Sequence, residues 1–451
     1  MKKTLYQNIY FILKIFIIFI YAASARSEIE IKNWQEDINL TNNGKNSKII
    51  IAGEVHSIPK NSYHGNFSII FDKKQKINIK KVKFDNKIAQ YSFNKNKLDI
   101  IFNSKKINNQ QLKIEYEFNE IYKNNNKYLR QEFISAPKWI SGANAKINLS
   151  IPNHLNIVSI HKNLQKINNK IIYQGKVSKS GLSELIKLTP KSSIWNLEID
   201  NHINTDQEVK SLTAKIPIYF LGSGQKIKNS KVISNLKINS SETKDRIHYI
   251  KYNDIKPQNI NIKLQANIKS GSNNRININR NPSQYLEISK KDRQILQNIL
   301  NKIKTNPKYL NLPLYAKIGK FVHDYIKYDK SYVGKLLQVK SILDTKKGVC
   351  IEYATLFNAL ARAANIPAIV INGIANGEYD KFERHSWNLI YYQNKWIEVD
   401  PTWDLMSGIV SSSHIYFYDN DLNAINAEWT ERSNQSTKVL LNSDFKINET
   451  E

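Results

Sequence analysis

Cysteine is almost absent from this chain, which has 451 residues and a single cysteine, Cys350. One thiol cannot form an internal disulfide, and it excludes the zinc ribbons that need several cysteine ligands. No cysteine lies near the N-terminus, which excludes a cysteine-linked lipoprotein anchor. A lone thiol is a liability in an oxidising compartment, so Cys350 is expected to be either buried or used.

Long apolar runs are lacking after the first residues. Lys2 and Lys3 precede a mostly apolar stretch at residues 9–21, and Ala23-Ser24-Ala25 forms a small-x-small cleavage site. This pattern predicts a signal peptide over residues 1–25. The stretch is shorter than the roughly 20 residues of a membrane-spanning helix, although an uncleaved anchor remains open. The mature chain is therefore expected to be periplasmic or secreted.

Phosphate-binding and dinucleotide-binding motifs are missing from a chain with only 15 glycines. We expect no organic cofactor and no metal. An export signal also argues against a nucleic-acid partner, which an exported chain would not meet.

Negative charge is scarce in the N-terminal part. Residues 310–451 contain 15 Lys and Arg against 17 Asp and Glu, a balance of −2, so the net charge of +28 leaves +30 for residues 1–309. A basic surface can attract an anionic envelope surface or acidic glycans. The alternative is a solvated lysine-rich surface set by composition, and the sequence leaves both open.

Residues 28–279 contain a long series of short β-rich runs, separated by Asn, Lys, Gly and Ser. Such runs predict antiparallel β-sandwiches. Helical periodicity begins near residue 289 and gives way to three strands after residue 367. The predicted division is a signal peptide (1–25), a β-sandwich domain (26–204), a second β-rich module with linker (205–283), a domain of helices and strands (284–430) and a C-terminal tail (431–451).

Cys350 opens the third predicted helix, which carries charges only at Glu352 and Arg362 and should be buried. Unpaired N–H groups at a helix start stabilise a thiolate, the nucleophilic form of cysteine. Taken alone, the residue is better explained as a small apolar member of the core.

The stretch "HSWNLIYYQNKWIEVDPTWD" predicts a hairpin that turns at Gln393-Asn394. If Tyr392 pairs with Lys395, His385 and Asp400 become diagonal neighbours on one face of the sheet, where their side chains can meet. A loop longer by one residue would place them on opposite faces. Cys350, His385 and Asp400 then form a candidate nucleophile, general base and orienting carboxylate.

Gly348-Val349-Cys350, the helix "IEYATLFNALARAANIPA", His385-Ser386-Trp387 and "KWIEVDPTWD" resemble the core of the transglutaminase-like superfamily. The resemblance covers about residues 312–405. It implies an α+β fold in which a papain-related catalytic domain follows one or two β-sandwich domains. It also implies that Cys350, His385 and Asp400 are the catalytic triad.

The family resemblance implies chemistry through a thioester acyl-enzyme, with hydrolysis by water or transfer to an amine. We expect a cysteine-dependent amide hydrolase acting on protein or peptide amides. A transglutaminase that joins glutamine to amines, and a non-catalytic envelope-binding protein, remain the alternatives. Trp387, Trp396 and Trp403 are expected to wall the cleft or the core.

Overall fold

The computed structural model describes residues 28–41, 44–57, 64–70, 76–84, 86–94, 97–103, 110–121, 128–161, 163–217, 225–244, 247–271, 281–377, 381–419, 426–431 and 439–449. The predicted signal peptide and most of the predicted linker lie outside these residues. Within the described part, no helix is both long enough and apolar enough to cross a bilayer.

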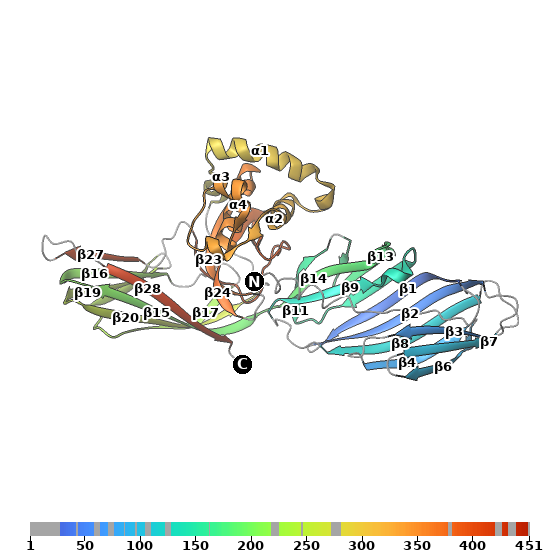
Figure 1. Ribbon diagram of the computed structural model, residues 1–451. Coiled ribbons are helices and arrows are strands. Elements are labelled where there is room, and N and C mark those ends of the chain that lie inside the picture. Colours follow the sequence, from blue (N-terminus) through green and yellow to red (C-terminus); the bar gives the residue numbers. More distant parts are fainter. Residues whose placement is uncertain are drawn as a thin grey trace. The chain divides into compact units, whose positions relative to one another are not determined.

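The chain forms two compact units that alternate along the sequence. The first unit comprises residues 1–125, 131–153 and 160–186, and the second comprises residues 126–130, 154–159 and 187–451. Both units are drawn in Figure 1.

The first unit is built of strands. Its larger sheet has the order β12-β13-β10-β1-β2-β8-β4-β5, and a smaller one has the order β3-β7-β6. The bounds are β1 (Glu28–Thr41), β2 (Gly44–Ser57), β3 (His64–Ile70), β4 (Lys76–Phe84), β5 (Lys87–Ile88), β6 (Gln90–Asn94), β7 (Lys97–Asn103), β8 (Gln110–Ile121), β10 (Asn144–Ser150), β12 (Gln165–Ile167) and β13 (Lys170–Lys176). The chain has one more sheet, which is not confined to this unit; its order is β11-β14-β9, with β9 (Arg130–Ala136), β11 (Leu155–Ile160) and β14 (Leu182–Pro190).

Alternating side chains explain why these segments form sheets. In β2, Ile49 and Ile51 are buried, while Lys48 points outward and pairs with Glu115 of β8 at 2.8 Å. The predicted antiparallel pairing needs one correction, because β1 and β10 pair in parallel. Parallel neighbours require a crossover connection, and an alternating pattern within each strand does not reveal it.

A β-sandwich belongs to the second unit. Its sheets have the orders β17-β20-β15-β28 and β18-β19-β16-β27. Their bounds are β15 (Ser193–Thr205), β16 (Val209–Pro217), β17 (Lys226–Ser234), β18 (Ser240–Lys244), β19 (Ile247–Ile255), β20 (Gln258–Ser270), β27 (Asn426–Glu431) and β28 (Val439–Glu449). Side chains from both sheets, including Trp195, Tyr252 and Ile262, form one hydrophobic cluster.

The domain boundaries differ from those predicted. The predicted boundary at residues 204/205 cuts off β15, which pairs with β20 and so belongs to the second sandwich. The predicted C-terminal tail contains β28, which pairs with β15 along its whole length. Both errors concern strands that pair with partners far away in the sequence, which local patterns do not specify.

The helical part of the second unit contains α1 (Lys290–Thr305), α2 (Leu314–Tyr325), α3 (Val339–Thr345) and α4 (Cys350–Ala363). Its sheet has the order β25-β24-β23-β26, with β23 (Ala368–Asn376), β24 (Phe382–Tyr392), β25 (Lys395–Val399) and β26 (Ile415–Asp419). A small parallel pair joins β21 (Lys327–Tyr328) to β22 (Lys347–Gly348). Short 3-10 turns cover Lys138–Ile140, Pro282–Leu286, Pro307–Tyr309 and Lys330–Tyr332.

Helix α4 is the centre of this part, as its apolar sequence predicted. It packs on β23 and β24, and α1, α2 and α3 contact its other sides (Figure 1). Phe357 and Leu360 are completely buried. Burying each such side chain contributes about 1.5–3 kcal/mol, so the helix is firmly fixed on the sheet. This arrangement places the start of α4 beside β24.

Candidate active site

Cys350 is the first residue of α4, and the residues around it explain why the helix starts there. The Glu352 side chain turns back to accept the Val349 backbone N–H at 2.8 Å, which satisfies a donor that a helix start leaves free. Gly348 permits this approach, because a Cβ at that position would lie 2.4 Å from the Glu352 Cβ. The thiol is partly exposed.

The predicted hairpin is confirmed in its register. Tyr392 pairs with Lys395 and Tyr391 with Trp396. Gln393 and Asn394 both have positive φ angles, 49° and 58°, as expected for the two-residue turn that fits the twist of a hairpin.

This register joins His385 to Asp400. His385 Nε2 lies 2.9 Å from Asp400 Oδ2, and both side chains are buried. On its other side, the imidazole ring of His385 forms a side-chain hydrogen bond with the Cys350 thiol. Since Nε2 is engaged by Asp400, the bond to Cys350 falls to Nδ1. The structure therefore brings all three predicted site residues together.

Asp400 is completely buried and receives four donors. Its Oδ1 accepts the backbone N–H groups of Thr402 at 2.8 Å and Trp403 at 3.3 Å. Its Oδ2 faces His385 and, at 3.3 Å, Nε2 of His414. Burial alone would raise the pKa of Asp400, but the charge of His385 and these hydrogen bonds hold the pKa well below its usual range. Asp400 thus remains a carboxylate.

The surroundings of Cys350 and His385 favour a thiolate–imidazolium ion pair over the neutral thiol and imidazole. Burial raises the pKa of the Cys350 thiol, but the hydrogen bond and charge of His385 and the Ser386 backbone N–H outweigh it and lower the pKa. Burial lowers the pKa of His385, yet Asp400 and Cys350 raise it to about 10. The N-terminus of α4 adds further stabilisation of negative charge on sulfur. Both shifts favour the thiolate and the imidazolium over the neutral pair.

Asn388 fixes the strand that carries His385 against the helix that carries Cys350. Asn388 is buried, and its Nδ2 donates to the Ala354 carbonyl of α4 at 3.0 Å. Two residue pairs along the ladder, Ser386 Oγ donates to Asn372 Oδ1 of β23 at 2.8 Å. The first bond ties β24 to α4, and the second ties β24 to β23.

Tryptophans enclose the imidazole, in line with the prediction for Trp387 and Trp403. The Trp403 ring stacks on His385 with centroids 4.1 Å apart and planes at 11°. Trp387 is fully buried, with its ring centroid 6.0 Å from that of His385. An aromatic face stabilises a nearby cation, so this stacking favours the imidazolium.

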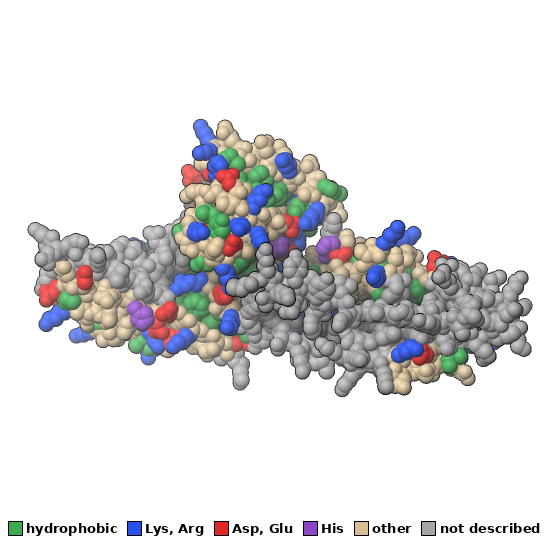
Figure 2. Space-filling view, in the orientation of Figure 1, with side chains coloured by type: hydrophobic (Ala, Val, Ile, Leu, Met, Phe, Trp, Pro, Cys, Tyr) green, Lys and Arg blue, Asp and Glu red, His purple; other side chains and the backbone are tan. Residues whose placement is uncertain are grey.

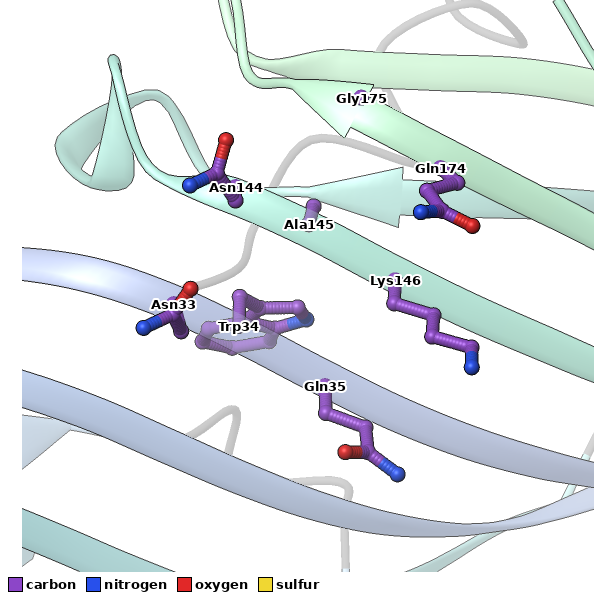
Figure 3. Close-up of a pocket in the computed structure, with 8 residues that line it drawn as sticks. All are labelled: Asn33, Trp34, Gln35, Asn144, Ala145, Lys146, Gln174 and Gly175. Atoms are coloured by element: carbon purple, nitrogen blue, oxygen red, sulfur yellow. The ribbon is translucent and has the colours of Figure 1, made fainter.

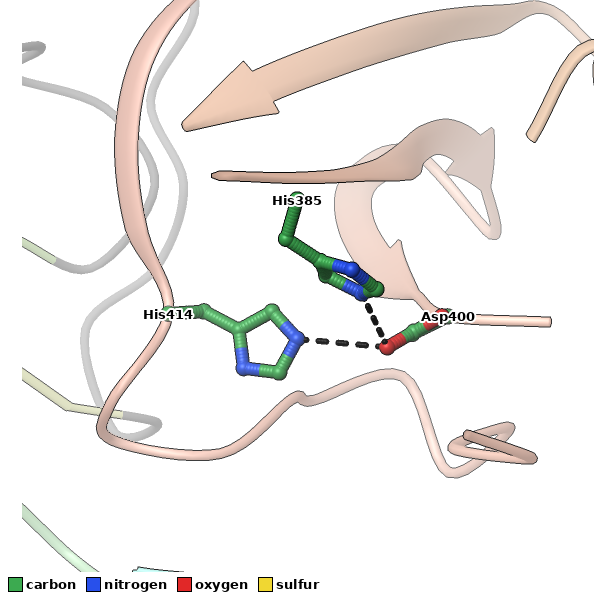
Figure 4. Close-up of side chains that lie close together, drawn as sticks. All are labelled: His385, Asp400 and His414. Atoms are coloured by element: carbon green, nitrogen blue, oxygen red, sulfur yellow. Dashed lines mark hydrogen bonds and ion pairs between the residues drawn. The ribbon is translucent and has the colours of Figure 1, made fainter. Parts of the chain in front are cut away.

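His414 is the residue that the sequence did not reveal. It precedes β26, and its ring meets the rings of Trp387 and Trp403 edge-on at 5.0 and 5.1 Å. Figure 4 shows both histidines turned toward the same oxygen of Asp400. No local pattern marks His414, because its place depends on how the loop between residues 400 and 415 returns to the sheet.

His385, Asp400 and His414 are also close enough together to bind a metal ion, since one ligand atom from each lies within 4.8 Å of the others. Both Nε2 atoms, however, point at a single carboxylate oxygen at hydrogen-bond distances. A bound metal would require His385 to present an unprotonated Nε2, whereas the Asp400 bond needs a protonated one. The arrangement therefore fits a hydrogen-bonded group better than a metal centre.

Glu398 is a second buried acid near the site, and it provides a stability test. Burial raises its pKa to about 8, against one hydrogen bond from Trp387 Nε1 at 3.1 Å.

Because the pKa of Glu398 is raised in the folded state, the stability that protonated Glu398 contributes is present below the unfolded pKa and is lost as pH rises toward 8. Glu398→Gln keeps the bond and cannot ionise. Thermal unfolding should show a Tm several degrees above wild type at pH 7.5 and little difference at pH 4.5; equal shifts at both would contradict this account.

Cys350, His385 and Asp400 do not line the hollow found in the first unit. That hollow, of about 600 Å³, is lined by residues of β1, β10 and β13 (Figure 3): Asn33, Trp34, Gln35, Asn144, Ala145, Lys146, Gln174 and Gly175. None of the three predicted site residues lines it, so its volume says nothing about their substrate.

The segment that contains Cys350, His385 and Asp400 also matches a known family. Residues 289–401 match the family described as the transglutaminase-like superfamily. These residues form a transglutaminase-like domain. The domain contains α1–α4 and β23–β25, and it ends one residue after Asp400, so His414 lies beyond the matched segment.

Curated relatives match short segments of the chain. The kyphoscoliosis peptidase of Mus musculus is 32% identical over 83 residues, covering 16% of this chain and 12% of that protein. A protein-glutamine gamma-glutamyltransferase of Pseudomonas aeruginosa is 35% identical over 75 residues, covering 14% of this chain and 11% of that protein. The chain thus spans about an eighth of the length of these relatives or less.

Two solved structures are similar over larger parts. One, described as a candidate cysteine protease from Cytophaga hutchinsonii, has 14% identity and a TM-score of 0.42, covering 58% of this chain and 91% of that one. The periplasmic domain of TgpA from Pseudomonas aeruginosa has 18% identity and a TM-score of 0.24, covering 45% and 73%. Both scores are too low to support an argument about the whole chain.

Proposed function

We propose that this chain is an exported cysteine-dependent amide hydrolase that acts on protein or peptide amides through a thioester acyl-enzyme. One observation carries the proposal: Cys350, His385 and Asp400 form a continuous hydrogen-bonded series inside the transglutaminase-like domain.

The first half of the reaction uses the ion pair. The Cys350 thiolate attacks the amide carbonyl carbon, and the C=O π electrons move onto oxygen. As the tetrahedral intermediate collapses, the C–N bond breaks and His385 Nδ1–H gives its proton to the leaving amine. The products are a free amine and a thioester on Cys350, with His385 now neutral.

In the second half, neutral His385 takes a proton from water, and the hydroxide formed attacks the thioester. The C–S bond breaks, the acid leaves, and the thiolate–imidazolium pair is restored. Throughout, Asp400 holds the His385 Nε2–H, so that Nδ1 is the nitrogen that exchanges protons with sulfur and substrate.

Donors for the oxyanion come from the start of α4 and its surroundings. The Cys350 backbone N–H lies in the first turn, where a helix offers no internal acceptor. Tyr328 lies near enough for the charge of Cys350 to act on its phenol. Burial and that charge raise the pKa of Tyr328 to about 12, so its O–H stays protonated and can donate to substrate.

Transfer to an amine is the second candidate, because one relative is a gamma-glutamyltransferase and another a peptidase. The two outcomes differ only in what attacks the thioester. Incorporation of a labelled primary amine into a glutamine-containing protein would favour transfer, whereas ammonia release without amine uptake would favour hydrolysis.

The alternative function, binding to an anionic envelope surface, has less support. On the face shown in Figure 2, Lys and Arg side chains are spread over the described parts among Asp and Glu, without gathering in one patch. Several lysines pair with acids across strands, as Lys32 pairs with Glu54 and Lys263 with Glu198. Pairing of this kind reduces the field that a distant anion would meet.

The decisive test is the reactivity of the thiol. Iodoacetamide at pH 6 should label Cys350 of the full chain stoichiometrically and much faster than free cysteine, because the lowered pKa of Cys350 enlarges its thiolate fraction at that pH. His385→Ala removes the main stabilising charge and should slow labelling by about 10- to 100-fold. Peptide mass spectrometry measures both. A wild-type thiol no faster than free cysteine would contradict the proposed function.

A further inference from the structure

We propose that His414 is a positioning residue of the catalytic group: its Nε2–H holds the Asp400 carboxylate, and through it His385, in the orientation that keeps Cys350 ionised. This inference rests on the proposed function.

The first support is the geometry at one oxygen. Asp400 Oδ2 receives His385 Nε2 at 2.9 Å and His414 Nε2 at 3.3 Å. The other oxygen is occupied by the two backbone donors of the turn. Both oxygens of the Asp400 carboxylate therefore accept hydrogen bonds. His414 supplies the second side-chain donor to Oδ2, beside His385. Without His414, Oδ2 would be fixed by His385 alone.

The second support is burial. The side chains of Asp400 and His414 have no exposed surface, and that of His385 is 5% exposed. Water cannot replace a donor that is lost here, so an unpaired Oδ2 lone pair costs more than it would at the surface. The rings of Trp387, Trp403 and His385 surround His414 and fix its plane.

The third support is charge. The groups that face His414 are the Asp400 carboxylate, the His385 imidazolium, the Ser411 carbonyl and the edges and faces of the two indoles. Burial lowers the pKa of His414, and the positive charge of His385 lowers it further, against the opposing effect of Asp400. A neutral His414 can donate a hydrogen bond without competing with His385 for the single negative charge of Asp400.

The fourth support is how firmly the loop before β26 is held. Ser411, Ser412 and Ser413 precede His414 and are all buried. Ser411 Oγ donates to the Tyr128 carbonyl at 2.7 Å, and the Ser412 N–H donates to Thr189 Oγ1 at 2.9 Å. The Ser412 carbonyl accepts Trp195 Nε1 of the sandwich at 3.2 Å. A backbone so anchored leaves His414 little freedom to turn away from Asp400.

The test compares variants of the full chain by the rate of iodoacetamide labelling at Cys350 between pH 4 and 9. His414→Phe keeps a ring of similar shape but removes the donor, so labelling at pH 6 should fall by about 10- to 100-fold and its pH midpoint should rise. His414→Gln keeps an N–H donor and should stay within about 3-fold of wild type. The control, His248→Phe, changes a half-buried histidine of the sandwich and should have no effect.

Equal labelling curves for His414→Phe and wild type would overturn the inference while leaving an activated wild-type thiol, and so the proposed function, intact. If His414→Phe does not fold, as judged by circular dichroism, His414→Ala with added imidazole replaces it: recovery of labelling supports the role, and no recovery contradicts it. Stoichiometric zinc in the wild type that His414→Phe loses would make the three side chains a metal site and would likewise overturn the inference.

Discussion

Cys350→Ser is expected to abolish the burst of p-nitrophenol that the wild-type chain should release from p-nitrophenyl acetate, slowing acylation by at least about 1000-fold. The hydroxyl fits where the thiol stood. An alcohol, however, holds its proton far more tightly than a thiol, and the charge of His385 is not enough to ionise it. Stopped-flow absorbance measures the burst, and intact mass should show one acetyl group on the wild type alone.

Two comparisons separate a chemical from a structural effect. Cys350→Ala should also lack the burst, with a Tm slightly below that of wild type, because the substitution removes a thiolate whose interactions with His385 and the Ser386 backbone outweigh its burial. A burst that survives in Cys350→Ser, or an acetyl group found on lysine in the wild type, would show that another nucleophile reacts.

The pH profile of the wild-type burst follows from the same ion pair. Acylation should rise with pH through the lowered pKa of Cys350, as the thiolate forms. With an amide substrate, acylation should fall as pH approaches 10, where His385 loses its proton and can no longer protonate the leaving amine; p-nitrophenolate leaves without a proton and should not show this fall. The folding stability contributed by His385 has the same upper limit: it is complete below the unfolded histidine pKa and is lost as pH rises through about 10.

The sequence was most informative where function depends on contacts close in the chain. Asn394 can adopt a positive φ, so a two-residue turn at residues 393–394 was predictable, and the turn fixes which residues of the hairpin share a face. His385 and Asp400 followed from that register alone. The apolar run that follows Gly348-Val349 likewise placed Cys350 at the start of α4.

Contacts between residues far apart in the sequence could not be predicted from it, for a physical reason. His414 reaches Asp400 only after a loop that returns to β26, and β28 completes a sheet begun by β15 more than two hundred residues earlier. Neither position carries a periodic signal, because one is a loop residue and the other a strand whose partner is chosen by tertiary packing. Helix α3 was missed because a segment of seven residues shows too little periodicity.

The sandwich of the second unit is part of how the catalytic group is held. Trp195 of β15 and Ser270 of β20 both donate to the Ser412 carbonyl, two residues before His414. Ile374 of β23 and Ile415 of β26 belong to the hydrophobic cluster of the sandwich. A transglutaminase-like segment cut out at residues 289–401 would therefore lose these supports, which is why each experiment uses the full chain.

Asp400 is where these supports converge, and Asp400→Ala should have the largest combined effect. The substitution leaves His385, His414 and two backbone N–H groups without their acceptor in a site closed to water. Removing one partner from such a buried charged group costs about 3–5 kcal/mol. We expect a large fall in Tm by calorimetry and loss of the p-nitrophenyl acetate burst.

Asp400→Asn separates the loss of charge from the loss of volume. With the amide oxygen accepting the Thr402 and Trp403 N–H groups, the amide NH₂ must face the two histidines. His385 then takes the tautomer with its proton on Nδ1 and none on Nε2, so it is neutral and cannot accept the thiol proton. Acylation should fall about 10⁴-fold while Tm falls less than in Asp400→Ala. A variant that loses stability but keeps the burst would show that Asp400 holds the turn and does not orient the base.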